Sequence, residues 1–117
     1  MDYAEQILAL SEELGQVADK FAKACEDYST NYYQFQRLLG TRIMALSDKK
    51  PSMEKIIAEN LSIESKDGFN VFYRDYITNK ALKEGYTAQM EALKSRIMAR
   101  QSIMRYNGKM DSFGEVK

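Results

Sequence analysis

Several residue types are scarce or missing in this chain. It has no histidine and no tryptophan, and only one cysteine and one proline among 117 residues. Without histidine, neither histidine acid–base catalysis nor a histidine metal site is available. The single cysteine, Cys25, excludes an internal disulfide and favours a reducing, intracellular setting. The single proline suits a mostly helical chain, because proline interrupts helices.

An excess of charge is also lacking. The 17 basic and 17 acidic side chains give a formal net charge of zero, so bulk electrostatics favours no class of partner. No apolar run approaches the length of a membrane span, and the acidic N-terminus is unlike a secretory signal. These absences predict a cytoplasmic protein without membrane contact.

Motifs that carry chemistry are missing too. The sequence contains no glycine-rich phosphate loop, nucleophile elbow, cysteine pair or metal-ligand spacing. A pair of packed helices also encloses no obvious pocket. We therefore expect no enzyme and no catalytic residue, and we expect no cofactor, metal or small-molecule substrate.

Apolar residues recur at alternating steps of four and three through the first third of the chain. This heptad pattern predicts a helix over about residues 2–46, with Asp2 as its cap. A second step of four, from Tyr28 to Tyr32, is a stutter that relaxes the supercoil. The pattern leaves open whether the helix continues through Gly40.

Two polar connectors divide the rest of the chain. Pro51 ends the first helix, and Ser52 is a suitable cap for a short helix over about 53–61. The second connector ends in Asp67-Gly68, a turn signal, and helical spacing returns over about 69–106. A phase shift between Ile77 and Leu82 indicates a kink, a bend around the first helix, or a short break near Asn79. Asn107-Gly108 predicts the end of the helix, with a frayed tail over 108–117.

The pattern predicts a single all-α domain over 1–117, an elongated helical hairpin or coiled coil with a short helix at the turn. Neither long helix can bury its apolar seam alone, so each must pack on the other helix, on a second chain, or on both. We expect a homo-oligomer formed through these seams. The predicted seam residues are Ile7, Leu10, Leu14, Val17, Phe21, Tyr86, Met90, Leu93 and Ile97.

Charge is distributed unevenly along the chain. Residues 1–30 carry seven acidic and two basic side chains, whereas residues 91–117 carry six basic and three acidic ones. One interpretation is mutual neutralisation where the two ends of a hairpin meet. The other is that regularly spaced cations bind a phosphate backbone. Lys49 and Lys50 extend the basic positions into the first connector, and the candidate nucleic-acid-binding residues are Lys83, Lys94, Arg96, Arg100, Arg105, Arg37, Arg42 and Tyr33.

Aromatic residues crowd two places, one around Tyr28 to Phe35 and one around Phe69 to Tyr76. The simplest interpretation is a wide layer of the core where the short helix packs. The alternative is that tyrosines off the seam, Tyr33 and Tyr73, stack on bases or anchor a partner. Met98 also lies off the seam and suggests a second, adaptable contact face.

The layout as a whole resembles small phage-encoded coiled-coil proteins. These have an acidic heptad helix, a connector containing serine and lysine, and a last helix of the type seen here as YTAQMEALKSRIMARQSIMR. Some of them look like recombination mediators, which are helical oligomers that bind single-stranded DNA and help to load a recombinase. The resemblance implies that Lys94, Arg96, Arg100 and Arg105 contact phosphates.

Three functions remain open from the sequence. The first is a non-enzymatic oligomer of DNA metabolism that binds single-stranded DNA, a recombination or replication partner, or both. The second is a phage-encoded adaptor or inhibitor that binds a host or defence enzyme through its acidic first helix. The third is a structural coiled coil. The acidic candidates for the second function are Glu12, Glu13, Asp19, Glu26 and Asp27.

Overall fold

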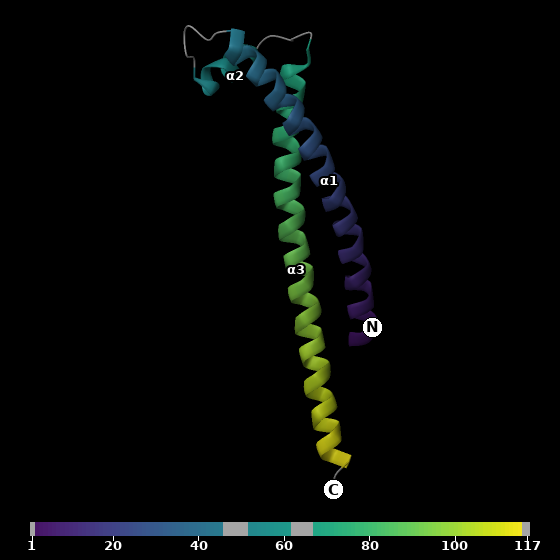
Figure 1. The fold of residues 1–117 in the computed structure, drawn as a ribbon. Coiled ribbons are helices and arrows are strands. Elements are labelled where there is room, and N and C mark those ends of the chain that lie inside the picture. The colour runs from purple at the N-terminus through teal and green to yellow at the C-terminus, as the bar shows by residue number, and fades with distance from the viewer. Residues whose placement is uncertain (1, 46–51, 62–66, 116–117) are drawn as a thin grey trace. The chain divides into compact units, whose positions relative to one another are not determined.

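The computed structural model describes residues 2–45, 52–61 and 67–115, and side chains at 2–45, 52–59 and 67–108. Within these ranges the chain forms three helices: α1 (Tyr3–Ala45), α2 (Met53–Leu61) and α3 (Phe69–Glu115). The long helices α1 and α3 pack as a hairpin, and α2 lies at the turn between them (Figure 1). The predicted all-α hairpin with a short helix at the turn is therefore confirmed.

Each helix begins where a local signal places it. The carboxylate Oδ1 of Asp2 accepts the backbone N–H of Glu5 at 2.8 Å, which caps α1. The hydroxyl of Ser52 accepts the backbone N–H of Lys55 at 3.2 Å, which caps α2. Before α3, Gly68 takes a φ of 79°, in the left-handed region that glycine tolerates best. The turn predicted at Asp67-Gly68 is therefore present.

The C-terminal end of α3 differs from the prediction. The helix was expected to end at Asn107-Gly108, but it continues to Glu115. Among the described residues, Gly68 is the glycine at positive φ. Gly108 therefore does not take the left-handed conformation that would end a helix. One glycine disfavours a helix by only about 1 kcal/mol, so it need not stop a long one. The helix thus extends beyond its predicted end, as far as Glu115.

Both long helices are continuous at the positions where the sequence left a question. α1 passes through Gly40 without a break. α3 passes through Asn79, whose side-chain amide donates to the backbone carbonyl of Asp75 at 2.9 Å. In the described part of the chain no helix is long and apolar enough to cross a membrane. The first connector, including Lys49 and Lys50, and most of the second lie outside the described residues.

The chain divides into two compact units, which we name the turn unit and the end unit. The turn unit is Ala22–Lys83, and the end unit combines Met1–Phe21 with Glu84–Lys117. In the turn unit, α2 inserts Ile56 into a core with side chains from both long helices. Its buried members are Phe35, Leu38, Leu39, Ile56 and Phe69.

The end unit has its own core, built from the heptad positions of the two long helices. Leu10 and Val17 of α1 and Leu93 of α3 are buried in it. Leu14, Tyr86, Met90 and Ile97 pack around them and are partly buried. Most of the predicted seam is thus occupied by the partner helix of the same chain. Ile7 and Phe21 are half-buried at the same heptad phase.

Candidate interaction surfaces

Arg100 of α3 is held inside the end unit. Its Nε donates to the side-chain oxygen of Gln6 on α1 at 2.8 Å, and its Nη1 donates to the backbone carbonyl of Arg96 at 3.1 Å. The side chain is half-buried. These contacts fix Arg100 in the packing of the hairpin, so it offers little to a phosphate.

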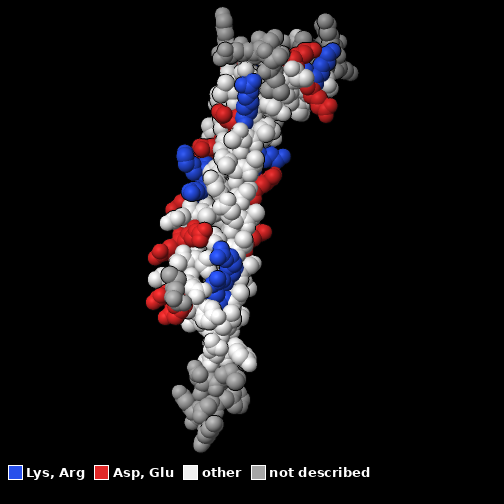
Figure 2. Space-filling view, turned by 180° about the vertical axis from the view of Figure 1, so that it is seen from behind, with Lys and Arg blue, Asp and Glu red and all other residues white. Residues whose placement is uncertain are grey.

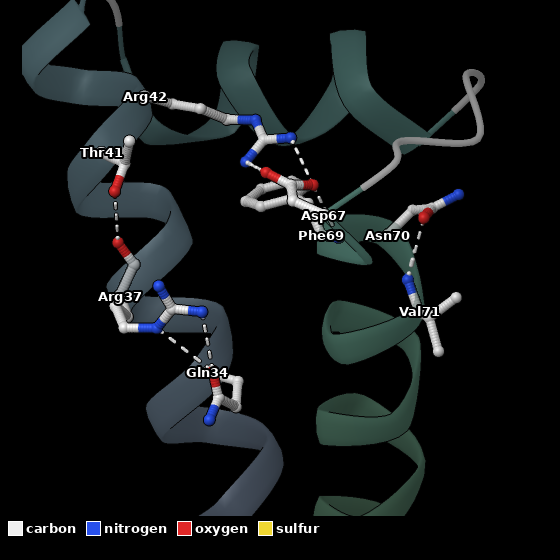
Figure 3. Close-up of polar contacts among 8 residues, drawn as sticks. All are labelled: Gln34, Arg37, Thr41, Arg42, Asp67, Phe69, Asn70 and Val71. Carbon is white, nitrogen blue, oxygen red and sulfur yellow. Dashed lines mark hydrogen bonds and ion pairs between the residues drawn. The ribbon is translucent and has the colours of Figure 1, made fainter.

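Arg42 has a structural role in the turn unit (Figure 3). Its guanidinium forms a two-pronged ion pair with Asp67, at 2.9 and 3.1 Å, and lies 4.0 Å from the centre of the Phe69 ring. The same Asp67 carboxylate accepts the backbone N–H of Phe69 at 3.2 Å. Two-pronged arginine–carboxylate pairs are among the stronger polar contacts, so Arg42 connects the end of α1 to the start of α3.

Lys83 is also engaged within the turn unit. Its ammonium lies 4.1 Å from the centre of the Tyr28 ring, a cation–π contact, and the residue is half-buried. Lys83 is one of the predicted nucleic-acid-binding residues, and its contact with Tyr28 gives it a role in the core packing. Three of the eight predicted nucleic-acid-binding side chains are thus held by the fold.

Arg37 and Tyr33 are exposed on α1 in the turn unit. The guanidinium of Arg37 donates from Nε and Nη2 to the side-chain oxygen of Gln34, at 3.2 and 3.0 Å (Figure 3). Tyr33 is 65% exposed, as its position off the heptad seam predicts. Both side chains remain accessible to a partner.

The other basic candidates, Lys94, Arg96 and Arg105, are exposed on α3 in the end unit. Lys94 and Arg105 lie about 20° apart around the helix, because eleven residues make slightly more than three full turns. Arg96 lies about 160° from Lys94, on the other flank of α3. Acidic and basic side chains are interspersed on the face seen in Figure 2. The exposed basic side chains of α3 therefore do not form one continuous surface.

Acidic side chains form a more regular surface on α1. Glu5, Glu12 and Asp19 follow one another at intervals of seven residues, and all three are exposed. Seven residues make nearly two turns, so the carboxylates line up along one side of α1, about 10 Å apart. We call these three residues the acidic row. Figure 2 shows acidic side chains gathered along the first half of α1.

Only part of the acidic row was predictable from the acidic candidates of the sequence, Glu12, Glu13, Asp19, Glu26 and Asp27. These candidates include Glu12 and Asp19 but not Glu5, which the interval of seven would have identified. They also include Asp27, which is half-buried and lies 3.5 Å from the ammonium of Lys23. Glu13 and Glu26 are exposed as predicted, with Glu26 in the turn unit.

The second predicted off-seam tyrosine, Tyr73, is part of the aromatic core. Its ring lies 5.2 Å from that of Phe35 and 6.2 Å from that of Tyr76, centre to centre. Tyr76 is surrounded on several sides, with ring centres at 5.1 Å for Tyr32 and 5.4 Å for Tyr28. Tyr73 is partly buried against this core, which agrees with the interpretation of the aromatics as a core layer.

Burial raises the pKa of the Tyr76 hydroxyl above its ordinary value of 10.0. The neighbouring Tyr28, Tyr32 and Tyr73 raise the pKa further, since their phenolates would repel that of Tyr76, while Lys80 lowers it. The hydroxyl is therefore neutral throughout the physiological range. It acts in packing and offers no acid or base for chemistry near neutral pH.

Among the described residues, no group of three or more cysteine, aspartate or glutamate side chains is placed to hold a metal ion. A hollow on α3 in the turn unit is lined by Tyr73, Arg74, Ile77 and Thr78, and it contains no grouping of nucleophile and base. Comparisons of the chain with models of protein families, with curated proteins and with solved structures give no match.

Proposed function

We propose that the chain is a non-catalytic interaction protein that binds a basic surface of a protein partner through the acidic row. The observation that carries this proposal is the exposed alignment of Glu5, Glu12 and Asp19 along α1. A rigid helix holds carboxylates at fixed intervals, which favours a partner with a complementary row of cations. This function corresponds to an adaptor or inhibitor.

The distribution of charge within the end unit supports the same proposal. Residues 3–21 of α1 contain four acidic side chains and one basic one. None of the four acids forms an ion pair with another described residue. Their charge is therefore left for a partner, and binding should weaken as salt screens it.

The test is affinity capture from the cells that express the chain, at low and high salt. A variant with Glu5→Gln, Glu12→Gln and Asp19→Asn removes the charge of the row and keeps its shape. The matched control carries Glu13→Gln, Glu54→Gln and Asp75→Asn, which removes three exposed acids elsewhere. We expect a partner retained by the wild type and the control, lost by the row variant, and released by salt. Equal capture by both variants would contradict the proposal.

Binding of single-stranded DNA is the second candidate, favoured by the exposure of Lys94 and Arg105 on one side of α3. Fluorescence anisotropy of a labelled poly-pyrimidine strand, titrated at two salt concentrations, tests it directly. If DNA binds there, Lys94→Gln with Arg105→Gln should weaken binding and flatten the salt dependence. The matched control is Lys20→Gln with Lys80→Gln, at exposed lysines away from that row. Absence of binding at low salt would exclude this function.

A further inference from the structure

One face of α3 in the end unit remains uncovered by the hairpin. The packed face carries Tyr86, Met90, Leu93 and Ile97. About 160° around the helix, a second set of residues recurs at alternating steps of three and four, and all of its members are exposed. We call this set the outer face: Gly85, Ala88, Ala92, Ser95, Ala99, Ser102 and Tyr106.

The outer face is bordered by large apolar side chains that water still reaches. Met98 and Ile103 flank it on opposite sides and are 64% and 40% exposed, and Tyr106 at its end is 64% exposed. A Cβ added at Gly85 would meet nothing within 4 Å, so the backbone there is open to close approach. Apolar side chains gathered beside an accessible helix backbone are typical of a contact with another helix.

The spacing of the outer face corresponds to heptad positions a and d. Gly85, Ala92 and Ala99 fall at a, and Ala88, Ser95 and Ser102 fall at d. The flanking positions are then g, with Glu84, Glu91 and Met98, and e, with Gln89, Arg96 and Ile103. In a parallel pair of helices, each g residue faces the e residue five positions later on the other chain.

We propose that a second copy of this chain binds the outer face, with the two α3 helices parallel. In this register Glu91 faces Arg96 of the second copy, and Met98 faces Ile103 of the second copy. Glu84 faces Gln89 of the second copy in the same way. In chain order, three successive heptads thus pair a carboxylate with an amide, an acid with a base, and an apolar side chain with another apolar one.

The charges on the single chain agree with this arrangement. Glu91 and Arg96 are exposed, and neither forms an ion pair with a described residue of its own chain. In an antiparallel pair g residues would face g residues, so Glu91 would meet Met98 or a second Glu91 instead of an arginine. The residues at e and g thus favour a second copy of this chain as the partner, and they favour parallel over antiparallel helices.

The outer face replaces the heptad seam as the site of self-association. The seam was expected to join chains, but Leu10, Val17 and Leu93 are already buried within one chain. The small residues at a and d would let the two helix backbones come close, and the pairs at e and g would close both sides of the contact.

Exchanging the two charges tests the pairing. Glu91→Arg or Arg96→Glu alone places like charges opposite each other on both sides of the dimer, and each should raise the dimer dissociation constant about tenfold. The double variant Glu91→Arg with Arg96→Glu restores opposite charges and should return the constant to near that of the wild type. Sedimentation equilibrium measures all four proteins, and circular dichroism verifies that each is folded.

Lys94→Glu is the matched control, because it reverses an exposed charge on α3 outside the a, d, e and g positions. It should leave the dissociation constant within about twofold. A monomeric wild type at high micromolar concentration would overturn the proposal, and so would a double variant as weak as the single ones. All these variants retain the acidic row, so this test is independent of partner binding.

A cysteine tests the direction of the two helices. With Cys25→Ser as background, Ala99→Cys places one thiol at an a position, where parallel helices bring identical residues together. Mild oxidation should join two Ala99→Cys chains in high yield. If cross-links form only when Ala88→Cys and Ala99→Cys chains are mixed, the helices are antiparallel and the parallel arrangement is overturned.

Discussion

Gly68 shows how one backbone angle constrains the choice of residue. Its φ of 79° lies in a region that side chains with a Cβ avoid, and a Cβ there would come 3.3 Å from the Phe72 ring. Gly68→Ala should therefore lower the free energy of unfolding by about 1–2 kcal/mol. Gly40→Ala is the control, in a helix with nothing within 4 Å of the added Cβ, and should raise it by about 0.5–1 kcal/mol. Urea denaturation measures both, and effects of the same sign would contradict the argument.

The raised pKa of Tyr76 predicts a loss of stability in alkali. Above about pH 10 the unfolded chain releases this proton, while the folded chain, with its higher pKa, retains it. The folded state then binds more protons, so stability decreases as the pH rises through this window. Below it, Tyr76 contributes no pH dependence. Denaturation of the wild type and Tyr76→Phe between about pH 8 and 11 tests this; an unchanged slope in the variant would contradict it.

The exposure of individual residues was the part of the candidate site that the sequence predicted least well. The partner of Arg100 is Gln6, 94 residues away, and the partner of Arg42 is Asp67, 25 residues away. No local pattern contains such contacts, because they depend on how the helices meet. Tyr33 was predicted correctly to be exposed, since its position off the seam is a local property.

At the scale of elements, most boundaries were predictable because they depend on nearby residues. Asp2 and Ser52 cap the helices that the sequence assigned to them. The end of α3 differs from the prediction because Asn107-Gly108 only weakly disfavours a helix and does not stop this one. Continuity through Gly40 could not be predicted, since the penalty of one glycine is similar in size to the packing of one side chain.

The short helix α2 is held in the core through Ile56, the one buried residue among its described side chains. It has nine residues, too few for a stable isolated helix, and Ile56 is 1% exposed in the core of the turn unit. Ile56→Ala should lower the free energy of unfolding by about 2–5 kcal/mol, and hydrogen exchange of the α2 amides should become faster. The control Lys55→Ala, at an exposed position, should change it by less than about 0.5 kcal/mol. Equal effects of the two changes would contradict this role.

At the scale of the whole molecule, the two cores share no residue. Leu93→Ala acts on the core of the end unit, and Ile56→Ala acts on that of the turn unit. If the chain unfolds in one step, the double variant should lose the sum of the two single losses to within about 0.5 kcal/mol. Chemical denaturation of all three variants tests this. A loss well below the sum would show that one unit unfolds before the other.

The stacked rings of the turn unit have a practical consequence for spectroscopy. The chain has no tryptophan, and the ring pairs of its described side chains all lie within Ala22–Lys83. Fixed aromatic packing gives rise to near-ultraviolet circular dichroism, whereas the far-ultraviolet signal reports every helix. The protein thus contains its own optical label for the turn unit. Recording the two signals together during unfolding would show whether the aromatic packing of that unit is lost before the helices, with no dye attached.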